Sequence, residues 1–294
     1  MTAYVSRRSC LSVPGGDARK ARRALSLNAD EIIFDLEDSV PVEEKDAARA
    51  SVMVAVLQCA ERGMRVGVRV NAVGTPWCTE DILAVASLEC TTTVVLPKVE
   101  SPGDVSYADR LLNGAESRVA RSSVVGLQLM IETPRAVGSL SALAVASPRV
   151  ESFVLGYADL AAALGRRNVS GRAWQRIQDE VLVAARSCGV QAIDGPVLTI
   201  AADDEFRAEV KSAVEFGFDG KWVIHPSQVD DVNRAFTADP ADVEHAEGLL
   251  RALDDGVARG VGAVVYRGQM IDEAVAVWAR RVLTRRPESK EERR

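Results

Sequence analysis

Carboxylates and a few basic side chains follow apolar, β-branched segments in this 294-residue chain, and they could do chemistry. They lie in Asp35-Leu36-Glu37-Asp38, Arg69-Val70-Asn71, Pro97-Lys98-Val99-Glu100, Glu132-Thr133-Pro134-Arg135, Asp159, Asp194 and His225-Pro226. Oxygen donors without a histidine–cysteine cluster suit a hard cation. Magnesium fits best, because it is commonly held by one or two carboxylates while water and substrate oxygens complete its coordination.

Glu132 and Asp159 are the candidate metal ligands. Glu132 follows the apolar run Leu127-Gln128-Leu129-Met130-Ile131, where an unpaired carboxylate would be poorly solvated. Asp159 follows the next apolar run along the chain, so the two side chains could share one ion. The alternatives are an ion pair of Glu132 with Arg135 or Arg69, and an N-cap role of Asp159 for a helix at 160–164.

A second group of carboxylates includes Asp35, Glu37 and Asp38, which are close enough that at least one needs a cation or a shared proton. Arg69 would emerge among them, where it could bind a substrate carboxylate or neutralise Glu37. Asp38 could instead cap the turn into the helix that follows Pro41.

The elements that must position these residues form a regular alternation. Apolar strand segments are predicted at 10–13, 31–36, 65–70, 93–96, 124–131, 152–155, 190–193 and 222–224. Helices are predicted between them at 18–27 after Asp17, at 43–62 between Pro41 and Gly63, and at 203–216 before Gly217. Eight strands favour a (β/α)8 TIM barrel, whose active site lies at the carboxyl ends of the strands. A doubly wound sheet fits less well, because Val13-Pro14-Gly15-Gly16-Asp17 is not its G-x-G-x-x-G turn.

The pattern changes after about Gln228. Helices are predicted at 230–236, 240–259 and 272–283, with a short strand at 260–266 and a turn at Arg267-Gly268-Gln269. We therefore predict a catalytic barrel over residues 1–228 and a helical appendage over residues 229–294.

Composition excludes several classes of protein. A net charge of −6 gives no support to nucleic-acid binding, and no apolar stretch is long enough to span a membrane. The five cysteines are scattered and the amino terminus lacks the apolar region of a secretory signal, which indicates a cytoplasmic protein.

Seven segments resemble, in order, motifs of the citrate lyase β-subunit-like branch of the HpcH/HpaI aldolase superfamily. They are Arg8-Ser9-Cys10-Leu11-Ser12-Val13-Pro14-Gly15, Phe34-Asp35-Leu36-Glu37-Asp38-Ser39-Val40, Val68-Arg69-Val70-Asn71, Leu96-Pro97-Lys98-Val99-Glu100, Ile131-Glu132-Thr133, Gly156-Tyr157-Ala158-Asp159-Leu160 and Gly220-Lys221-Trp222-Val223-Ile224-His225-Pro226-Ser227-Gln228. The resemblance implies a TIM barrel in a homotrimer or homohexamer, with Mg²⁺ (or Mn²⁺) held by Glu132 and Asp159 and with Arg69 on the substrate.

The resemblance also implies a coenzyme A site. Arg19 and Arg23, in a basic first helix whose ordinary explanation is a solvated face, stand where members of the family bind the coenzyme A phosphates. Four further residues would line the coenzyme and substrate site: Ser12, Val13, Ile224 and His225.

The carboxyl-terminal appendage resembles that of malyl-CoA and citramalyl-CoA lyases, in which it carries a catalytic aspartate to a neighbouring subunit. Gln269-Met270-Ile271-Asp272 matches that motif, although Asp272 could simply be the N-cap of the last helix. The implied reaction cleaves a carboxylated 3-hydroxyacyl-CoA into acetyl-CoA or propionyl-CoA and a 2-oxo acid, glyoxylate or pyruvate. Asp272 would move the proton, while Glu37 and Asp38 would orient Arg69 and metal-bound water. The alternatives are a malyl-CoA thioesterase, a citrate lyase β subunit acting on a carrier-protein thioester, and a non-catalytic scaffold.

Overall fold

Eight parallel strands close into a barrel in the order in which they occur in the sequence. The computed structural model describes residues 6–90, 92–167 and 172–286. The strands are β1 Ser9–Pro14, β2 Glu31–Asp35, β3 Arg65–Arg69, β4 Thr93–Leu96, β5 Gly126–Ile131, β6 Val150–Leu155, β7 Gln191–Asp194 and β8 Gly220–Val223. The predicted (β/α)8 barrel is confirmed, with a strand at each of the eight predicted positions.

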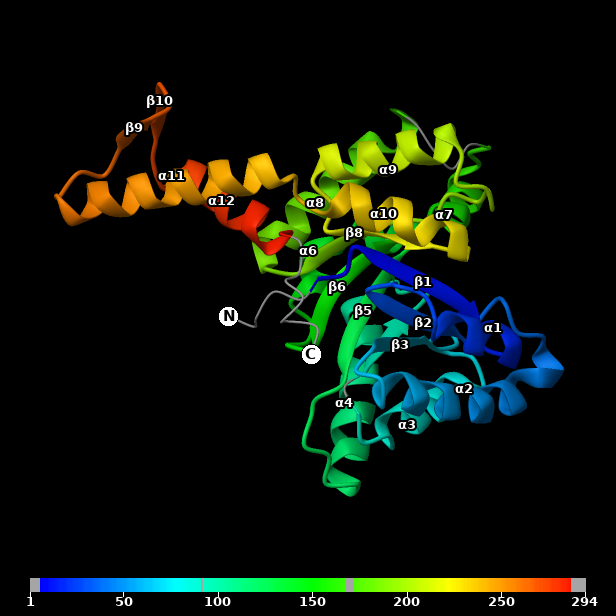
Figure 1. The fold of residues 1–294 in the computed structure, drawn as a ribbon. Coiled ribbons are helices and arrows are strands. Elements are labelled where there is room, and N and C mark those ends of the chain that lie inside the picture. Colours follow the sequence, from blue (N-terminus) through cyan, green and yellow to red (C-terminus); the bar gives the residue numbers. More distant parts are fainter. Residues whose placement is uncertain (1–5, 91, 168–171, 287–294) are drawn as a thin grey trace. The chain divides into compact units, whose positions relative to one another are not determined.

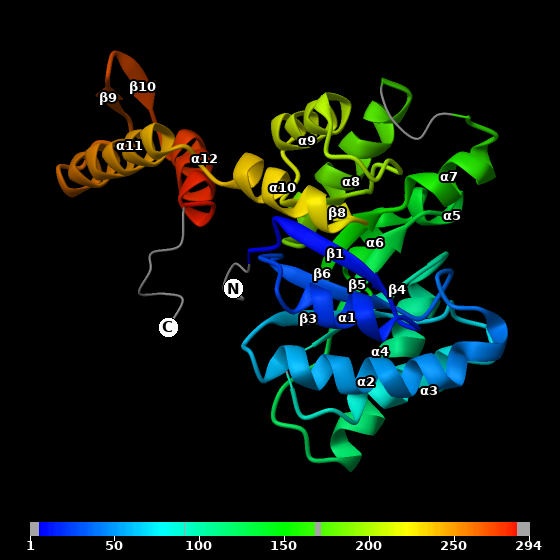
Figure 2. The same cartoon turned by 45° about the vertical axis from the view of Figure 1, so that its right-hand side comes forward.

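Helices surround the barrel strands (Figures 1 and 2). They are α1 Ala18–Ala24, η1 Val42–Glu44, α2 Lys45–Ala60, α3 Cys78–Ala86, α4 Pro102–Arg118, α5 Pro134–Val137, α6 Leu140–Ala144, α7 Tyr157–Leu164, η2 Arg172–Trp174, α8 Gln175–Cys188, α9 Asp204–Phe216, η3 Pro226–Gln228 and α10 Val229–Phe236. Local signals in the sequence set several ends. The Asp17 carboxylate accepts hydrogen bonds from the N–H groups of Arg19 and Lys20, and Gly217, with φ +99°, ends α9.

A layer of apolar side chains fills the middle of the barrel. It consists of Cys10, Ile33, Val95, Met130, Val154, Ile193 and Trp222, from every strand but β3. On β3, Gly67 pairs with Ile33, and a Cβ on this glycine would lie 2.8 Å from Ile33 Cδ1. Because side chains alternate along a strand, residues two positions further on face the same interior at its carboxyl-terminal end. Asp35, Arg69 and Glu132 occupy such positions.

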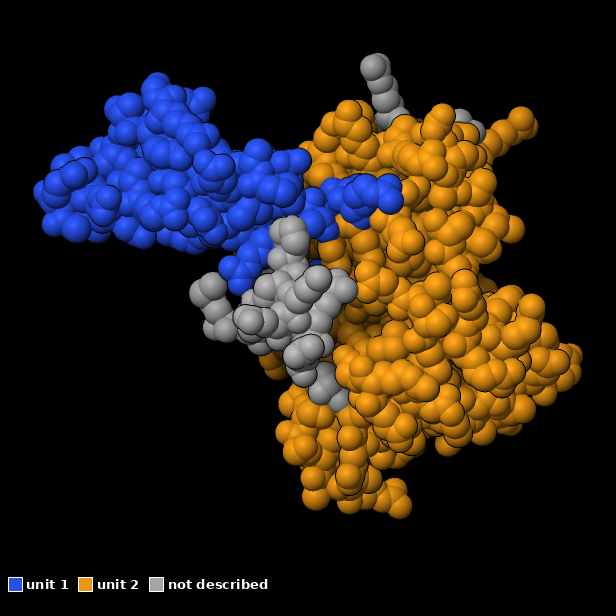
Figure 3. All heavy atoms as spheres, in the orientation of Figure 1, with its two compact units in different colours: residues 1–6, 234–294 blue, residues 7–233 orange. Residues whose placement is uncertain are grey.

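The chain divides into two compact units, coloured separately in Figure 3. One spans residues 7–233, and the other contains residues 6 and 234–286 of the described chain. The second unit is built from α11 Pro240–Ala258, β9 Val264–Tyr266, β10 Gln269–Ile271 and α12 Glu273–Thr284. It has its own apolar core, to which α11 contributes Leu249 and β10 contributes Ile271.

The structure refines the predicted appendage in one place. The predicted strand at 260–266 is shortened to β9, and the residues after the turn form a second strand, β10, which pairs with it in antiparallel fashion. Arg267 and Gly268 have φ +48° and +80°, which suits a tight hairpin. The boundary between residues 228 and 229 and the role of the appendage stay predictions. Of the helices in the described ranges, none is long and apolar enough to cross a membrane.

Candidate active site at the carboxyl-terminal end of the barrel

Arg69 is held in place by Asp35. The two residues pair in register at the ends of β3 and β2, and Arg69 Nε and Nη2 each donate to one Asp35 oxygen at 2.7 Å. The Asp35 carboxylate also accepts from the backbone N–H of Glu37 at 2.9 Å. Burial alone would raise the pKa of Asp35, but the hydrogen bonds and charge of Arg69 outweigh it and hold that pKa below its ordinary value. Asp35 is therefore the main anchor of Arg69, a role that the sequence assigned to Glu37 and Asp38.

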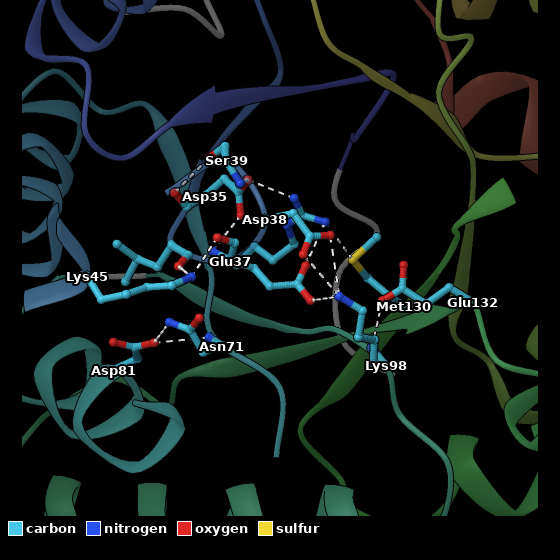
Figure 4. Close-up of polar contacts among 12 residues, drawn as sticks. Asp35, Glu37, Asp38, Ser39, Lys45, Asn71, Asp81, Lys98, Met130 and Glu132 are labelled. Atoms are coloured by element: carbon cyan, nitrogen blue, oxygen red, sulfur yellow. Dashed lines mark hydrogen bonds and ion pairs between the residues drawn. The ribbon is translucent and has the colours of Figure 1, made fainter. Parts of the chain in front are cut away.

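Lys98, which the sequence analysis did not single out, brings Glu37 and Asp38 together (Figure 4). Its ammonium group forms an ion pair with Glu37 Oε1 and lies 3.1 Å from Asp38 Oδ1. The other oxygen of Glu37 lies 3.0 Å from Arg69 Nη1. Burial raises the pKa of Glu37 even though these two cations act against it. The alternative in which Asp38 caps the turn after Pro41 is wrong, because η1 has no side-chain cap.

Glu132 is a buried carboxylate, 2% exposed, at the end of β5. Its Oε1 accepts a hydrogen bond of 2.6 Å from the backbone N–H of Lys98. Its side chain also packs against Gly156, where a Cβ would lie 2.5 Å from Glu132 Cβ. The alternative pairing with Arg135 is wrong, since Arg135 lies 3.3 Å from Glu100. Burial, together with the negative charges of Glu37 and Asp159, raises the pKa of Glu132 to about 7.

Asp159 lies in the first turn of α7. This helix begins at Tyr157 with Gly156 as its N-cap, so the alternative in which Asp159 is the N-cap is wrong. The helix starts directly after β6, earlier than the apolar spacing of residues 160–164 indicated. Asp159 is close enough to Glu132 for its charge to raise the pKa of that residue. The structure therefore places the two candidate metal ligands near enough for their charges to interact.

A buried polar cluster supports the turn that carries Asp159. Tyr157 donates its hydroxyl hydrogen to Asp194 Oδ1 at 2.5 Å and accepts a hydrogen bond from Gln178 Nε2 at 2.7 Å. The Lys221 ammonium forms an ion pair with Asp194 and donates to the carbonyl of Gly195 at 2.9 Å. The pattern of polar residues after the predicted strands indicates Asp194 but not Tyr157 or Lys221. The available signal was a tyrosine shortly after the apolar strand β6 and a lysine within the buried strand β8.

The charges of this region fit a divalent cation. Its carboxylates are Asp35, Glu37, Asp38, Glu132 and Asp159, and its cations are Arg69, Lys98 and the buried Lys45, which donates to two backbone carbonyls. When all of these groups are ionised, five carboxylates against three cations leave two negative charges. No cluster of three or more His, Cys, Asp or Glu suited to a metal occurs in the described ranges. A site with two carboxylates is what Mg²⁺ accepts when water and substrate supply its other ligands.

The remaining predicted residues lie on elements around the barrel mouth or in the second unit. Arg19 and Arg23 are exposed on α1, Ser12 is half-buried and Val13 is buried. Ile224 is exposed after β8, and His225 Nδ1 lies 2.8 Å from Ser227 Oγ. Asp272 is the N-cap of α12, where its carboxylate accepts from the N–H groups of Ala274 and Val275. The binding and catalytic roles of these residues stay predictions.

Comparison with known proteins identifies the family. Residues 8–226 match the family described as HpcH/HpaI aldolase/citrate lyase, and the chain belongs to this family. An L-malyl-CoA/beta-methylmalyl-CoA lyase of Cereibacter sphaeroides is 30% identical over 281 residues, which cover 89% of this chain and 88% of that enzyme. A (3S)-malyl-CoA thioesterase from the same species is 35% identical, covering 95% of this chain and 94% of the relative.

A solved structure extends the likeness to the bound groups of a relative. CitE from Mycobacterium tuberculosis, in complex with magnesium, acetoacetate and coenzyme A, has a TM-score of 0.74 and 28% identity, and the match covers 96% of this chain and 99% of that one. The predicted family and fold are confirmed, and magnesium and coenzyme A are the groups bound to this relative.

Proposed function

We propose that this protein is a Mg²⁺-dependent carbon–carbon lyase acting on a carboxylated 3-hydroxyacyl-CoA such as malyl-CoA or citramalyl-CoA. The products of cleavage are acetyl-CoA or propionyl-CoA and a 2-oxo acid, glyoxylate or pyruvate. The main observation in support of this proposal is that Arg69, which is held by two hydrogen bonds to Asp35, lies near the buried carboxylate Glu132. Membership in a family with malyl-CoA lyases supports the same conclusion.

The residues divide the work of a retro-Claisen cleavage. Glu132 and Asp159 would hold Mg²⁺, which when bound supplies Lewis-acid polarisation of the substrate hydroxyl or keto oxygen. Arg69 stabilises the negative charge that develops on the reacting oxygens, and its two hydrogen bonds to Asp35 orient it before the substrate arrives. Arg19 and Arg23 would bind the coenzyme A phosphates.

In this proposal the proton-transfer residue is Asp272, which belongs to the second unit. It would return a proton to the acyl carbon in cleavage and remove one in condensation. We propose a homotrimer or homohexamer in which the appendage of one chain delivers Asp272 to the barrel of a neighbour. Exposed apolar residues on the hairpin support a covering partner, since Val265 and Met270 lie opposite each other and are each 74% exposed. Five free cysteines support a cytoplasmic location.

The test is to incubate the protein with Mg²⁺, acetyl-CoA or propionyl-CoA, and glyoxylate or pyruvate, and to identify products by mass spectrometry. A malyl- or citramalyl-type thioester establishes the lyase and names the oxo acid. Free malate or citramalate without an accumulating thioester moves the assignment to thioesterase, the second candidate, which the 35% identical relative favours. No product, with or without EDTA, contradicts lyase chemistry on free coenzyme A thioesters and points to a carrier-bound substrate.

A further inference from the structure

Lys98 has an unusual backbone conformation at the end of β4. Its φ is +50°, in the left-handed region that side chains other than glycine rarely adopt. This turn lets one residue reach two sides of the site. The N–H donates to Glu132 after β5, and the ammonium group contacts Glu37 and Asp38 after β2 (Figure 4). Lys98 thus joins a metal-ligand candidate to the carboxylates around Arg69.

The donors of Arg69 are not all used in the same way. Asp35 accepts one hydrogen bond from Nε and one from Nη2, so the second N–H of Nη2 and both N–H groups of Nη1 remain. Nη1 forms an ion pair with Glu37 Oε2 at 3.0 Å and donates a weak hydrogen bond to Met130 Sδ at 3.9 Å. Although Glu37 Oε2 is buried, it accepts no hydrogen bond from the described part of the chain. Glu37 and Arg69 Nη1 therefore form an ion pair without a hydrogen bond.

We propose that Lys98 is a positioning residue that holds Glu37 by its Oε1 oxygen and so reserves Arg69 Nη1 for an anionic oxygen of the substrate. Without the ammonium group, Glu37 would rotate onto Nη1, and repulsion from Asp38 would favour that movement. Glu37 would then compete with the substrate for the N–H groups of Nη1. This inference rests on the proposed function, because it takes the oxo-acid carboxylate or the reacting oxygen as the anion that Arg69 meets.

The first experiment compares Lys98→Met with native protein at saturating Mg²⁺. Calorimetry measures binding of glyoxylate and of pyruvate, and steady-state assays measure kcat. We expect the oxo-acid Kd to rise at least tenfold and kcat to fall about 100-fold, the lower end of the loss for an oxyanion donor. Lys98→Arg should recover at least tenfold in kcat, and the thermal midpoint should stay within a few degrees. Lys211→Met is the matched control, because Lys211 is exposed on α9 and forms an ion pair with Glu215 one helical turn away.

Lys98→Gly separates the ammonium group from the backbone. Glycine adopts the left-handed conformation freely and keeps the N–H that Glu132 accepts, so we expect it to behave like Lys98→Met. A Lys98→Gly protein with native kcat, or a Lys98→Arg protein no better than Lys98→Met, would overturn the proposal. So would a loss of activity in Lys98→Met that merely follows unfolding below the assay temperature.

A double-mutant cycle tests whether Lys98 acts through Glu37. In a Glu37→Gln background the neutral side chain is not attracted strongly to Arg69, so Lys98→Met should lower kcat less than threefold. Equal losses in both backgrounds would refute the mechanism. The two proposals can fail separately. If the native protein binds an oxo acid without turnover and Lys98→Met binds it more weakly, the lyase function is wrong but the positioning role of Lys98 stands. If the native protein turns over its substrate and Lys98→Met leaves that rate unchanged, the lyase function stands and the positioning role is wrong. If the native protein neither binds an oxo acid nor turns over, both proposals are wrong.

Discussion

Replacing Glu132 by Gln is expected to stabilise the metal-free protein at alkaline pH. The folded protein holds the Glu132 proton with a pKa of about 7, against an ordinary value of 4.5, because the carboxylate is buried near other negative charges. A raised pKa in the folded state means that the stabilisation from this group is complete below about pH 4.5 and is lost as the pH rises through 7. The separation of the two pKa values corresponds to about 3 kcal/mol. Gln remains neutral at every pH and keeps an oxygen that accepts from the Lys98 N–H.

Thermal unfolding in EDTA at pH 5 and pH 8 measures this effect. At pH 5 the two proteins should have similar stability, and at pH 8 Glu132→Gln should be the more stable by about 3 kcal/mol, or about 6–12 °C. Adding Mg²⁺ at pH 8 should raise the midpoint of the native protein and leave that of Glu132→Gln unchanged. Glu100→Gln is the control, because this exposed carboxylate at the same end of the barrel should change stability by less than about 0.5 kcal/mol. A Glu132→Gln protein that is less stable than native at pH 8 without metal would refute the reasoning.

Three further substitutions test the supporting residues. Gly156→Ala places a Cβ 2.5 Å from Glu132 Cβ, so we expect the Mg²⁺ concentration for half-maximal activity to rise at least about tenfold, and an unchanged metal titration would contradict this. Tyr157→Phe removes the hydrogen bonds to Asp194 and Gln178, which should cost about 1–2 kcal/mol in urea denaturation, whereas equal midpoints would argue against the cluster. Asp272→Asn should lower kcat at least about 100-fold with stability unchanged, because Asn caps a helix as well as Asp does; full turnover would leave Asp272 as a cap alone.

Much of the barrel could be predicted because its signals are local. Alternating apolar segments and Asp17 and Gly217 at helix ends depend on residues close in the chain, and all appear where expected. The start of α7 could not be predicted in the same way. Its first turn is stabilised by Tyr157, whose partners Asp194 and Gln178 lie far along the sequence. The second strand of the hairpin was also missed, since a three-residue strand carries little periodicity.

The sequence by itself determined which chemical groups end each strand and therefore the class of ion and substrate that could bind. Only the tertiary structure decided the partners. Asp35, and not Glu37, accepts from both Nε and Nη2 of Arg69, because β2 and β3 pair these two residues in register. Lys98 reaches Glu37 and Glu132 because a left-handed turn directs its side chain and its N–H to different strands. Such contacts join residues more than 30 positions apart, and their distances depend on how all eight strands close.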